Sequence, residues 1–526
     1  MNISRRECLR LLSMGSAGTL AGCCIPSPHI DQSNQVPTTN FLSSQNLFAT
    51  ANEFTPCIDP HGHFFNATDL QAGGYIAGPV ASDEELNPKL YQALRIVGLV
   101  IDGAVRALGR SASKENRYLD ELESRLSLLG IEQSAQLIEE DIRIENERIA
   151  EELYKRIQRE DENNVFDEII SSDPFLQSLD IEFNEDFLRR LFNNEESIHG
   201  PAIAVNQLQT TQSTLGYLVF VKHMLSFRTH NIHTYRQAYY EYTDDLKVVH
   251  AGNALVDFDH WLGECDEPYS RLVDQIYLYD RLAKVHGGYI FNLISFNPWN
   301  GIIHGNRYYD LIEYALSLDT FRGAKLYPTI GYYPYGNATI VEPKRTTPHP
   351  PNMQEVDDAL EHLYEICGTS IPVMAHGNHS KGTMPSYKVM AGPRGWKKAL
   401  DKFQGLRANI GHFGGNSEVA GVNWTDEFID MMRKYPGLHT DLGYWDELQN
   451  DPNFARTFVQ RLEADIGNGE KAYDRVMFGT DWLMTSKDDQ WEYYPKDIYT
   501  NLLNGNASPE LLQAAFYNNA SRLFDL

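Results

Sequence analysis

The sequence of 526 residues predicts an α/β fold, a (β/α)8 TIM barrel with a large helical insertion after strand 1. Eight short runs are rich in Val, Ile, Phe and Tyr, most of them end in polar residues, and helical stretches separate the later ones. Alternation of strand and helix over eight units is typical of a closed parallel barrel. The almost continuous apolar character of the runs fits strands that are buried on both faces. In chain order the predicted strands are Cys57–His63, Leu246–Phe258, Gly288–Phe296, Phe321–Tyr327, Ile371–His376, Leu406–His412, Leu438–Tyr444 and Arg475–Asp481.

The helices of the barrel are predicted between these runs, for example over Met353–Ile366 and Trp424–Lys434. The last segment begins with Ser508-Pro509-Glu510, which supplies a cap residue, a proline at the first helical position and an acid in the first turn. We expect it to form the closing helix, over Leu511–Leu523.

One connection departs from the repeating pattern. About 185 residues separate His63 from the second strand, where a bare loop needs about 2 to 6. Because the insertion leaves strand 1 at its carboxyl end, it emerges on the face where such barrels place their chemistry. A lid and a solvated scaffold are both compatible with this position. The apolar positions that recur at helical spacing are Ile131, Ala135, Ile138, Ile142, Ile149, Leu153 and Ile157.

A second helical run in the insertion, Gln207–Phe227, has an apolar centre at residues 217–221. It is shorter and more polar than a membrane span.

The N-terminal segment predicts export. Ser4-Arg5-Arg6-Glu7-Cys8-Leu9 resembles a twin-arginine signal, and Leu20-Ala21-Gly22-Cys23 resembles a lipoprotein box; a plain N-terminal helix with an arginine pair is the alternative. We therefore expect a chain exported to the periplasmic side of the membrane and anchored there by lipid on Cys23. The predicted organisation is an export signal over 1–22, a polar linker over 23–51, a barrel formed by 52–81 and 246–526, and the helical insertion over 82–245.

Composition limits the partners. With 72 acidic against 45 basic side chains, the net charge is -27, so binding to nucleic acid is not expected. Membrane contact is expected only through the lipid anchor, the expected partner is a small-molecule substrate, and a homodimer stays open. Beyond the N-terminal cysteines only Cys57, Cys265 and Cys367 remain, and this odd number indicates no disulfide framework.

Five polar residues lie at the carboxyl ends of predicted strands. His61 and His63 are two residues apart in a strand, so their imidazoles point to the same face. His376, His412 and Asp481 each close a later strand. One such residue alone would be an ordinary core or rim side chain, but five at equivalent positions favour a metal site, because neutral imidazole and carboxylate are ligands of zinc and similar divalent ions.

Five motifs resemble those of the metal-dependent amidohydrolase superfamily, in particular its amidohydrolase-related (amidohydrolase 2) branch of (β/α)8 barrels. The resemblance implies that His61, His63, His376 and Asp481 bind one metal ion, and that His412 orients the nucleophilic water or completes a second metal site. The motifs are Asp59-Pro60-His61-Gly62-His63, Pro372-Val373-Met374-Ala375-His376-Gly377, Gly411-His412-Phe413-Gly414-Gly415, Phe478-Gly479-Thr480-Asp481-Trp482 and Asn519-Ala520-Ser521-Arg522-Leu523-Phe524.

The resemblance and the residues together predict a metal-dependent hydrolase of an amide, lactone or ester-like bond. Asp481 would accept the proton of a metal-activated water, with His412 as the second catalytic residue. Zinc is the expected cofactor, one ion rather than two. A metal-dependent decarboxylase or other lyase of the same superfamily is the first alternative, and a non-catalytic binding lipoprotein is the second.

Further residues are expected to contact substrate. Lys325 lies near the end of the fourth strand, where the resemblance implies a lysine that is carboxylated and bridges two metals; an unmodified lysine that contacts an anionic substrate and a salt bridge in the barrel mouth are the alternatives. Tyr327, Tyr332 and Tyr335 follow the same strand, and packing against the barrel rim is their alternative. Arg228, with His230, is expected to reach substrate from the insertion.

Overall fold

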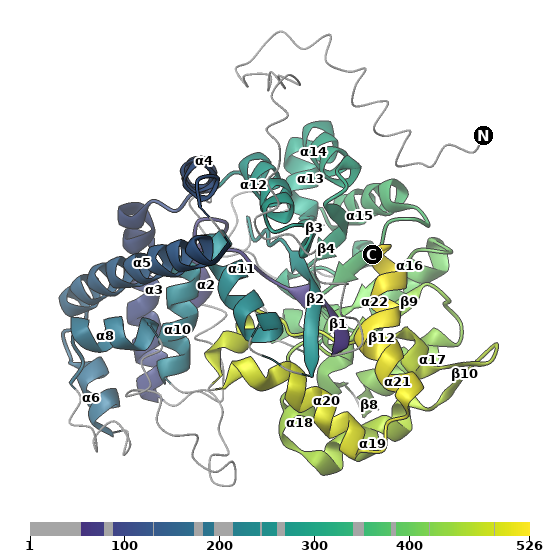
Figure 1. The fold of residues 1–526 in the computed structure, drawn as a ribbon. Coiled ribbons are helices and arrows are strands. Elements are labelled where there is room, and N and C mark those ends of the chain that lie inside the picture. Colours follow the sequence, from purple (N-terminus) through teal and green to yellow (C-terminus); the bar gives the residue numbers. More distant parts are fainter. Residues whose placement is uncertain are drawn as a thin grey trace.

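Eight parallel strands form one sheet in the order β1-β2-β3-β4-β5-β6-β9-β12, as the computed structural model shows (Figure 1). Beyond the ladders, the amide of Asp481 donates to the carbonyl of His61 over 2.6 Å and the amide of His63 donates to the carbonyl of Trp482, so the last strand meets the first. The predicted TIM barrel is therefore confirmed. The strands are β1 (Thr55–Gly62), β2 (Leu246–Ala254), β3 (Ile290–Ser295), β4 (Phe321–Leu326), β5 (Val373–Ala375), β6 (Ala408–Ile410), β9 (Leu438–Asp441) and β12 (Val476–Met477).

The structure describes residues 54–77, 88–129, 131–172, 182–193, 214–241, 243, 245–259, 269–339, 352–379, 385–419, 421–488 and 490–526. The predicted export signal, the linker and Cys23 lie outside these residues, as does Cys265. Cys57 and Cys367 are buried, and neither forms a disulfide with another described residue.

Helices surround the sheet, and their ends follow local chemistry. The side chain of Asn352 accepts from the amide of Gln354 at the start of α15, and the predicted cap Ser508 accepts from the amide of Leu511. The closing segment is helical as predicted, although residues Ala514–Asn518 form a π-helical turn. The barrel helices are α12 (Leu272–Val285), α13 (Pro298–His304), α14 (Asn306–Ser317), α15 (Met353–Cys367), α16 (Pro393–Lys402), α17 (Trp424–Met432), α18 (Asp446–Asn450), α19 (Pro452–Leu462), α20 (Tyr494–Asn504), α21 (Pro509–Gln513) and α22 (Asn519–Phe524).

Shorter elements complete the barrel loops. Two antiparallel pairs, β7 (Glu418–Val419) with β8 (Val422–Asn423) and β10 (Asp465–Gly467) with β11 (Glu470–Lys471), lie outside the main sheet. Single 3-10 turns cover Pro328–Ile330, Asn337–Thr339, Pro385–Ala391, Gly411–Asn416, Ala472–Arg475, Met484–Lys487 and Trp491–Tyr493.

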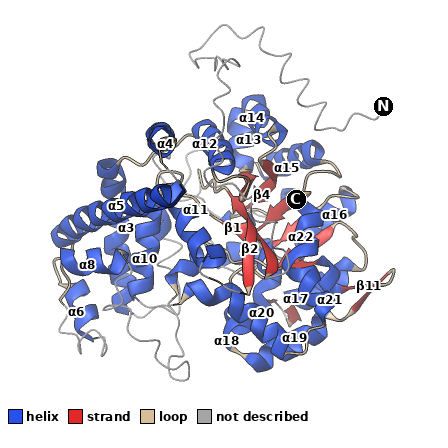
Figure 2. Cartoon of the chain, viewed as in Figure 1, coloured by secondary structure: helices blue, strands red, loops and turns tan. Residues whose placement is uncertain are grey.

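Between β1 and β2 the described chain is helical, and its helices group at one side of the barrel (Figures 1 and 2). The predicted periodic helix is α5, in which Ile149, Leu153 and Ile157 are fully buried. None of the described helices is long and apolar enough to cross a membrane. The helices are α2 (Ala72–Tyr75), α3 (Pro88–Leu108), α4 (Ala112–Leu126), α5 (Ile131–Glu160), α6 (Val165–Ser172), α8 (Glu185–Phe192), α10 (Thr214–Leu225) and α11 (Arg228–Arg236), followed by a π-helical turn over Gln237–Glu241.

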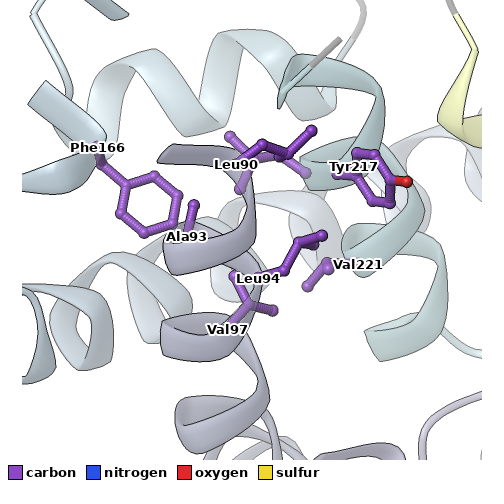
Figure 3. Close-up of a pocket in the computed structure, with 8 residues that line it drawn as sticks. Leu90, Ala93, Leu94, Val97, Phe166, Tyr217 and Val221 are labelled. Atoms are coloured by element: carbon purple, nitrogen blue, oxygen red, sulfur yellow. The ribbon is translucent and has the colours of Figure 1, made fainter. Parts of the chain in front are cut away.

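Two apolar regions are separate from the polar ends of the strands. One is a cluster in which side chains such as Phe291, Met374 and Met477 pack with Leu523 and Phe524 of α22. A small apolar pocket lies within the insertion between α3, α6 and α10, and none of its lining residues is a metal-ligand type (Figure 3). Its lining residues are Leu90, Ala93, Leu94, Val97, Phe166, Tyr217, Leu218 and Val221.

Candidate metal centre

Three of the predicted ligands converge at the carboxyl end of the barrel. His61 and His63 come from the end of β1, and Asp481 follows β12. The Nε2 atoms of both imidazoles lie 3.3 Å from Oδ1 of Asp481. All three donor atoms lie within 4.8 Å of one another, and the three residues are buried. Such a spacing brings two nitrogens and one oxygen within reach of a single ion.

Each imidazole of this set is held by its other ring nitrogen. His61 Nδ1 is 2.8 Å from Oδ1 of Asp441, and His63 Nδ1 is 2.6 Å from the carbonyl oxygen of Ala254. Because a carboxylate and a carbonyl only accept hydrogen bonds, both Nδ1 atoms carry the proton. Both Nε2 atoms therefore carry no proton and keep a lone pair that can bind a metal, and Asp441 completes a carboxylate–histidine pair of the kind found around metal sites.

Close packing of backbone around His61 fixes the plane of its ring. A Cβ atom at Gly411 would lie 2.7 Å from Cε1 of His61, and one at Gly443 would lie 2.7 Å from Nδ1. Both glycines follow the ends of their strands, β6 and β9. Only a residue without a side chain leaves space for the imidazole at these two positions.

His412 and His376 lie beside the three converging ligands. His412 Nδ1 donates to the carbonyl of Gly443 over 2.7 Å, so its Nε2 accepts from Nδ1 of His376 at 3.0 Å. The second nitrogen of His376, Nε2, is buried and has no hydrogen-bond partner among the described residues. An unpaired buried imidazole lone pair fits a further metal ligand, although His376 is not within the closely spaced set.

Two of these residues adopt a strained backbone. His412 has φ of 62° and Asp481 has φ of 55°, values that side-chain-bearing residues rarely adopt. Strain of this kind persists only where the surrounding structure imposes it, and it concentrates at functional sites.

Electrostatics keep the set in its metal-binding protonation state. Burial, and next the ammonium of Lys325, lower the pKa of His61 well below its ordinary value, and burial lowers the pKa of His63. Burial opposes ionisation of Asp481, but the neighbouring imidazoles outweigh it and hold the pKa of Asp481 below its usual range. The site therefore presents neutral imidazoles and an ionised carboxylate at neutral pH.

The structure brings Lys325 and Tyr327 to this set. Lys325 Nζ lies 3.2 Å from Nε2 of His61 and 5.1 Å from the ring centre of Tyr327, whose hydroxyl lies 3.1 Å from Nε2 of His63. Lys325 is fully buried, and burial lowers its pKa to about 8.

Tyr332 and Tyr335 make their contacts away from the three metal donors. Tyr332 is fully buried and its hydroxyl accepts from the amide of Tyr327, while the hydroxyl of Tyr335 contacts Glu361 on α15 and Lys402 on α16. The reason is Asp357 of α15, whose carboxylate accepts from the amides of residues 336, 337 and 338 and holds the loop against that helix. The rim packing weighed from the sequence describes these two side chains better than substrate contact does.

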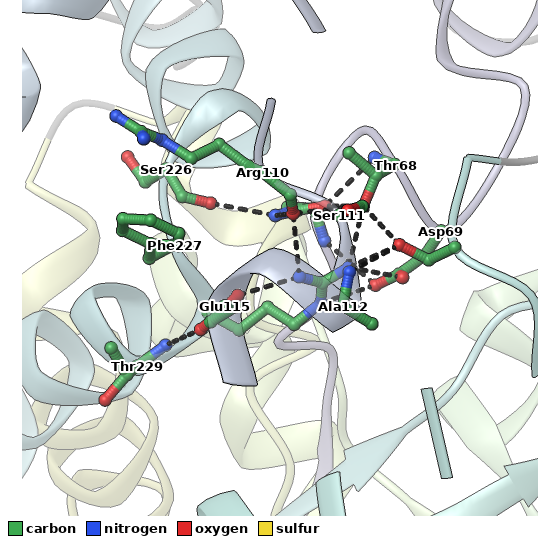
Figure 4. Close-up of polar contacts among 12 residues, drawn as sticks. Thr68, Asp69, Arg110, Ser111, Ala112, Glu115, Ser226, Phe227 and Thr229 are labelled. Carbon is green, nitrogen blue, oxygen red and sulfur yellow. Dashed lines mark hydrogen bonds and ion pairs between the residues drawn. The ribbon is translucent and has the colours of Figure 1, made fainter. Parts of the chain in front are cut away.

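Arg228 is likewise not at the metal set. Its guanidinium is fully buried, pairs with Asp69 and with Glu115 at 2.8 Å, and donates to the hydroxyl of Thr68 at 2.8 Å. Figure 4 shows the network of polar contacts to which Thr68, Asp69 and Glu115 belong. Two carboxylates already balance its charge, so we correct the expectation that it binds an anionic substrate. The neighbouring His230 is paired with Glu145. These contacts join α11 to α4, α5 and the loop after β1.

Sequence reasoning missed two carboxylates beside the site. Asp441 closes the seventh strand as Asp481 closes the eighth, and this shared position was the available signal. Asp59 is part of the β1 motif, but the sequence alone assigned it no role. It is fully buried and accepts from the amides of His61 and Thr480, which ties β1 to the end of β12.

The fold and the site define a class of protein: a parallel α/β barrel with a candidate metal site, formed by His61 and His63 at the end of β1 and Asp481 after β12, at the carboxyl ends of its strands, where such barrels place their active sites. Residues 309–526 match the model of the Amidohydrolase family. The match includes His376, His412 and Asp481 and supports the amidohydrolase-related superfamily.

Similar solved structures are distant in sequence. A protein described as a metal-dependent hydrolase from Lactobacillus casei ATCC 334 is 12% identical, with a TM-score of 0.37 over 89% of this chain and 95% of that one. The IDCase of Metarhizium anisopliae is 13% identical, with a TM-score of 0.32 over 56% of this chain and 78% of that one. No curated protein matches the chain.

Proposed function

We propose that this protein is a metal-dependent hydrolase of the amidohydrolase superfamily that acts on an amide, lactone or ester-like bond of a small molecule. The observation that supports the proposal most directly is the convergence of three donor atoms, because His61 Nε2 and His63 Nε2 each lie 3.3 Å from Oδ1 of Asp481. The match of the carboxyl-terminal half of the barrel to the Amidohydrolase family supports it.

The donor set fits zinc, and we propose one ion per chain. Zinc takes imidazole nitrogen and carboxylate oxygen, and catalytic sites commonly combine three protein ligands with a position left for water or substrate. His61, His63 and Asp481 would hold the ion. The Nε2 atom of His376 has no hydrogen-bond partner in the part of the chain that the structure describes, which supports this residue as an additional ligand.

When bound, a divalent ion lowers the pKa of water and polarises the oxygen of a scissile carbonyl. Asp481 is ionised, so its carboxylate can accept the proton of the attacking water and later return it to the leaving group. His412 is held by Gly443 in the orientation that faces the site. Lys325 and Tyr327 place an amine and a hydroxyl beside the ligands, where they can donate to a substrate oxygen.

Lys325 also bears on the number of ions. The side-chain amine of Lys325 must be neutral before it can react with carbon dioxide. Because its pKa is lowered to about 8, a larger fraction of this amine is neutral at neutral pH than for a lysine in water. A carboxylated Lys325 would bridge two ions, whereas an unmodified one is compatible with the single ion proposed here.

The proposal is tested by metal content and activity on the same preparations. Purified protein should contain about one equivalent of metal by mass spectrometry, and the double variant His61→Ala/His63→Ala should lose most of it. His286→Ala is the matched control, because His286 is a buried histidine that contacts Thr229 in the insertion. Full metal content in the double variant would show that these histidines are not the site, and two equivalents would favour a bridging Lys325.

Activity should be measured on a panel of lactones, amides, esters and aryl carboxylates, with and without chelator. Chelator-sensitive hydrolysis supports the proposal. Release of carbon dioxide from a carboxylate substrate would instead establish a decarboxylase, and a metal-loaded protein inactive on every compound would favour the binding lipoprotein.

We also propose that the protein is exported and held on the outer side of the membrane by lipid on Cys23. The twin arginines and the lipobox-like sequence before Cys23 support this location.

A further inference from the structure

A buried hydroxyl of the helical insertion contacts a carboxylate beside the metal centre. Tyr235 lies on α11, and its hydroxyl donates to Oδ2 of Asp59 at 2.5 Å. Both residues are fully buried. Although 176 positions separate them in the chain, the bond connects the insertion directly to β1.

Asp59 in turn forms hydrogen bonds with both segments that carry the ligands. Its Oδ1 accepts from the amide of His61 at 3.0 Å and from the amide of Thr480 at 3.1 Å. Its Oδ2 also accepts from the hydroxyl of Thr480 at 2.5 Å, and that hydroxyl accepts from the amide of Trp482 at 3.0 Å. The carboxylate therefore orients the backbone at His61 and on both sides of Asp481.

The ring of Tyr235 has little freedom to move. It packs edge-on against Phe64 with ring centres 5.1 Å apart, against Trp482 at 5.5 Å and against Tyr239 at 4.7 Å. Phe64 follows His63 and Trp482 follows Asp481, so the aromatic contacts converge on the same two segments. The insertion also holds the loop after β1, because the amide of Ala67 donates to the carbonyl of Met224 on α10 at 2.6 Å.

We infer that Tyr235 is a positioning residue for the metal centre: its hydroxyl fixes Asp59, and Asp59 sets the spacing between His61 and Asp481. The inference rests on the proposed metal site. It gives the insertion a part in metal binding that is additional to covering or scaffolding the barrel.

The test is metal affinity in Tyr235→Phe, measured by titrating metal-free protein with Co2+ and recording its visible absorption. Substitution of a group that supports a metal ligand typically lowers affinity about 10 to 100-fold. Because Tyr235 acts through Asp59, we expect a loss near the lower end, about 10-fold, together with altered Co2+ absorption bands that report a changed ligand geometry. Thr480→Val removes the other hydroxyl from the same carboxylate oxygen and should lower affinity by a similar factor.

Tyr239→Phe is the matched control. Tyr239 is also buried and packs against Tyr235 and Trp482, but its hydroxyl donates to the carbonyl of Trp491 at 2.8 Å and not to Asp59. If Tyr235 only packs the core, both phenylalanine variants should lose thermal stability alike and bind Co2+ as the wild type does, and the inference would be wrong. A wild-type chain that binds no Co2+, or binds it equally without His61 and His63, would refute the proposed function itself and the inference with it.

Discussion

Replacing Asp441 by Asn should weaken metal binding while leaving the fold intact. Oδ1 of Asp441 accepts from Nδ1 of His61 at 2.8 Å and from the amides of His412 and Gly443 at 3.1 and 3.0 Å, and Oδ2 accepts from Nδ2 of Asn409 at 2.8 Å. An asparagine keeps one oxygen for the first three donors. Its own amide would face Asn409, whose Oδ1 has no partner among the described residues and can rotate to accept. All four contacts can therefore be retained.

What the substitution removes is the negative charge behind His61. A carboxylate on the outer nitrogen of an imidazole raises its basicity as a ligand, and loss of such a partner costs about 10 to 100-fold in metal affinity, or about 1.4 to 2.7 kcal/mol. Asp441→Ala removes the acceptor altogether. It leaves four buried neutral donors without this acceptor, and each unsatisfied buried donor costs about 1 to 3 kcal/mol, so we expect a loss of roughly 3 to 5 kcal/mol in the free energy of unfolding.

The assay is competition between the protein and a chromophoric chelator, with thermal unfolding recorded on the metal-free form. Asp357→Asn is the control, since Asp357 is also buried and accepts four hydrogen bonds, all from residues 336–338 of a loop outside the metal set. Wild-type affinity in Asp441→Asn would refute the assignment of Asp441 as the support of His61. An equal loss in Asp357→Asn would show that the effect is a general one of buried carboxylates.

Three further predictions concern the site and the anchor. Asp481→Asn should lower turnover about 10² to 10⁴-fold with metal content largely retained if proton transfer is its main task; a joint fall of metal and activity that added metal restores would make it a ligand alone. Gly443→Ala places a Cβ 2.7 Å from Nδ1 of His61, so metal affinity should fall and stability should drop by about 1 to 3 kcal/mol, and an unchanged chelator competition would contradict the packing argument. Cys23→Ala should abolish lipid labelling of the exported chain, with the double substitution at Cys23 and Cys24 as the cleaner control; equal labelling in the double variant would exclude the anchor.

The sequence alone was enough to predict that the chain forms a barrel and that the polar residues lie at the carboxyl end of its strands. The local pattern of apolar residues shows where strands and helices alternate, and each short apolar run indicates that its own segment is buried. Parallel strands of one barrel share a carboxyl end, so His61, His63 and Asp481 had to lie on one rim. These conclusions need only local periodicity and a rule about topology, and both can be read along the chain.

Only the tertiary structure decided which side chains meet at that rim. Asp441 supports His61 across 380 positions, and the hydroxyl of Tyr235 reaches Asp59 across 176. The direction in which a side chain points depends on which buried donors and acceptors remain to be satisfied nearby, and those come from distant segments. The sequence does not show which carboxylates an arginine contacts, so it could not distinguish a substrate-binding Arg228 from a structural one. The ion pairs of Arg228 with Asp69 and Glu115 in the tertiary structure made this distinction.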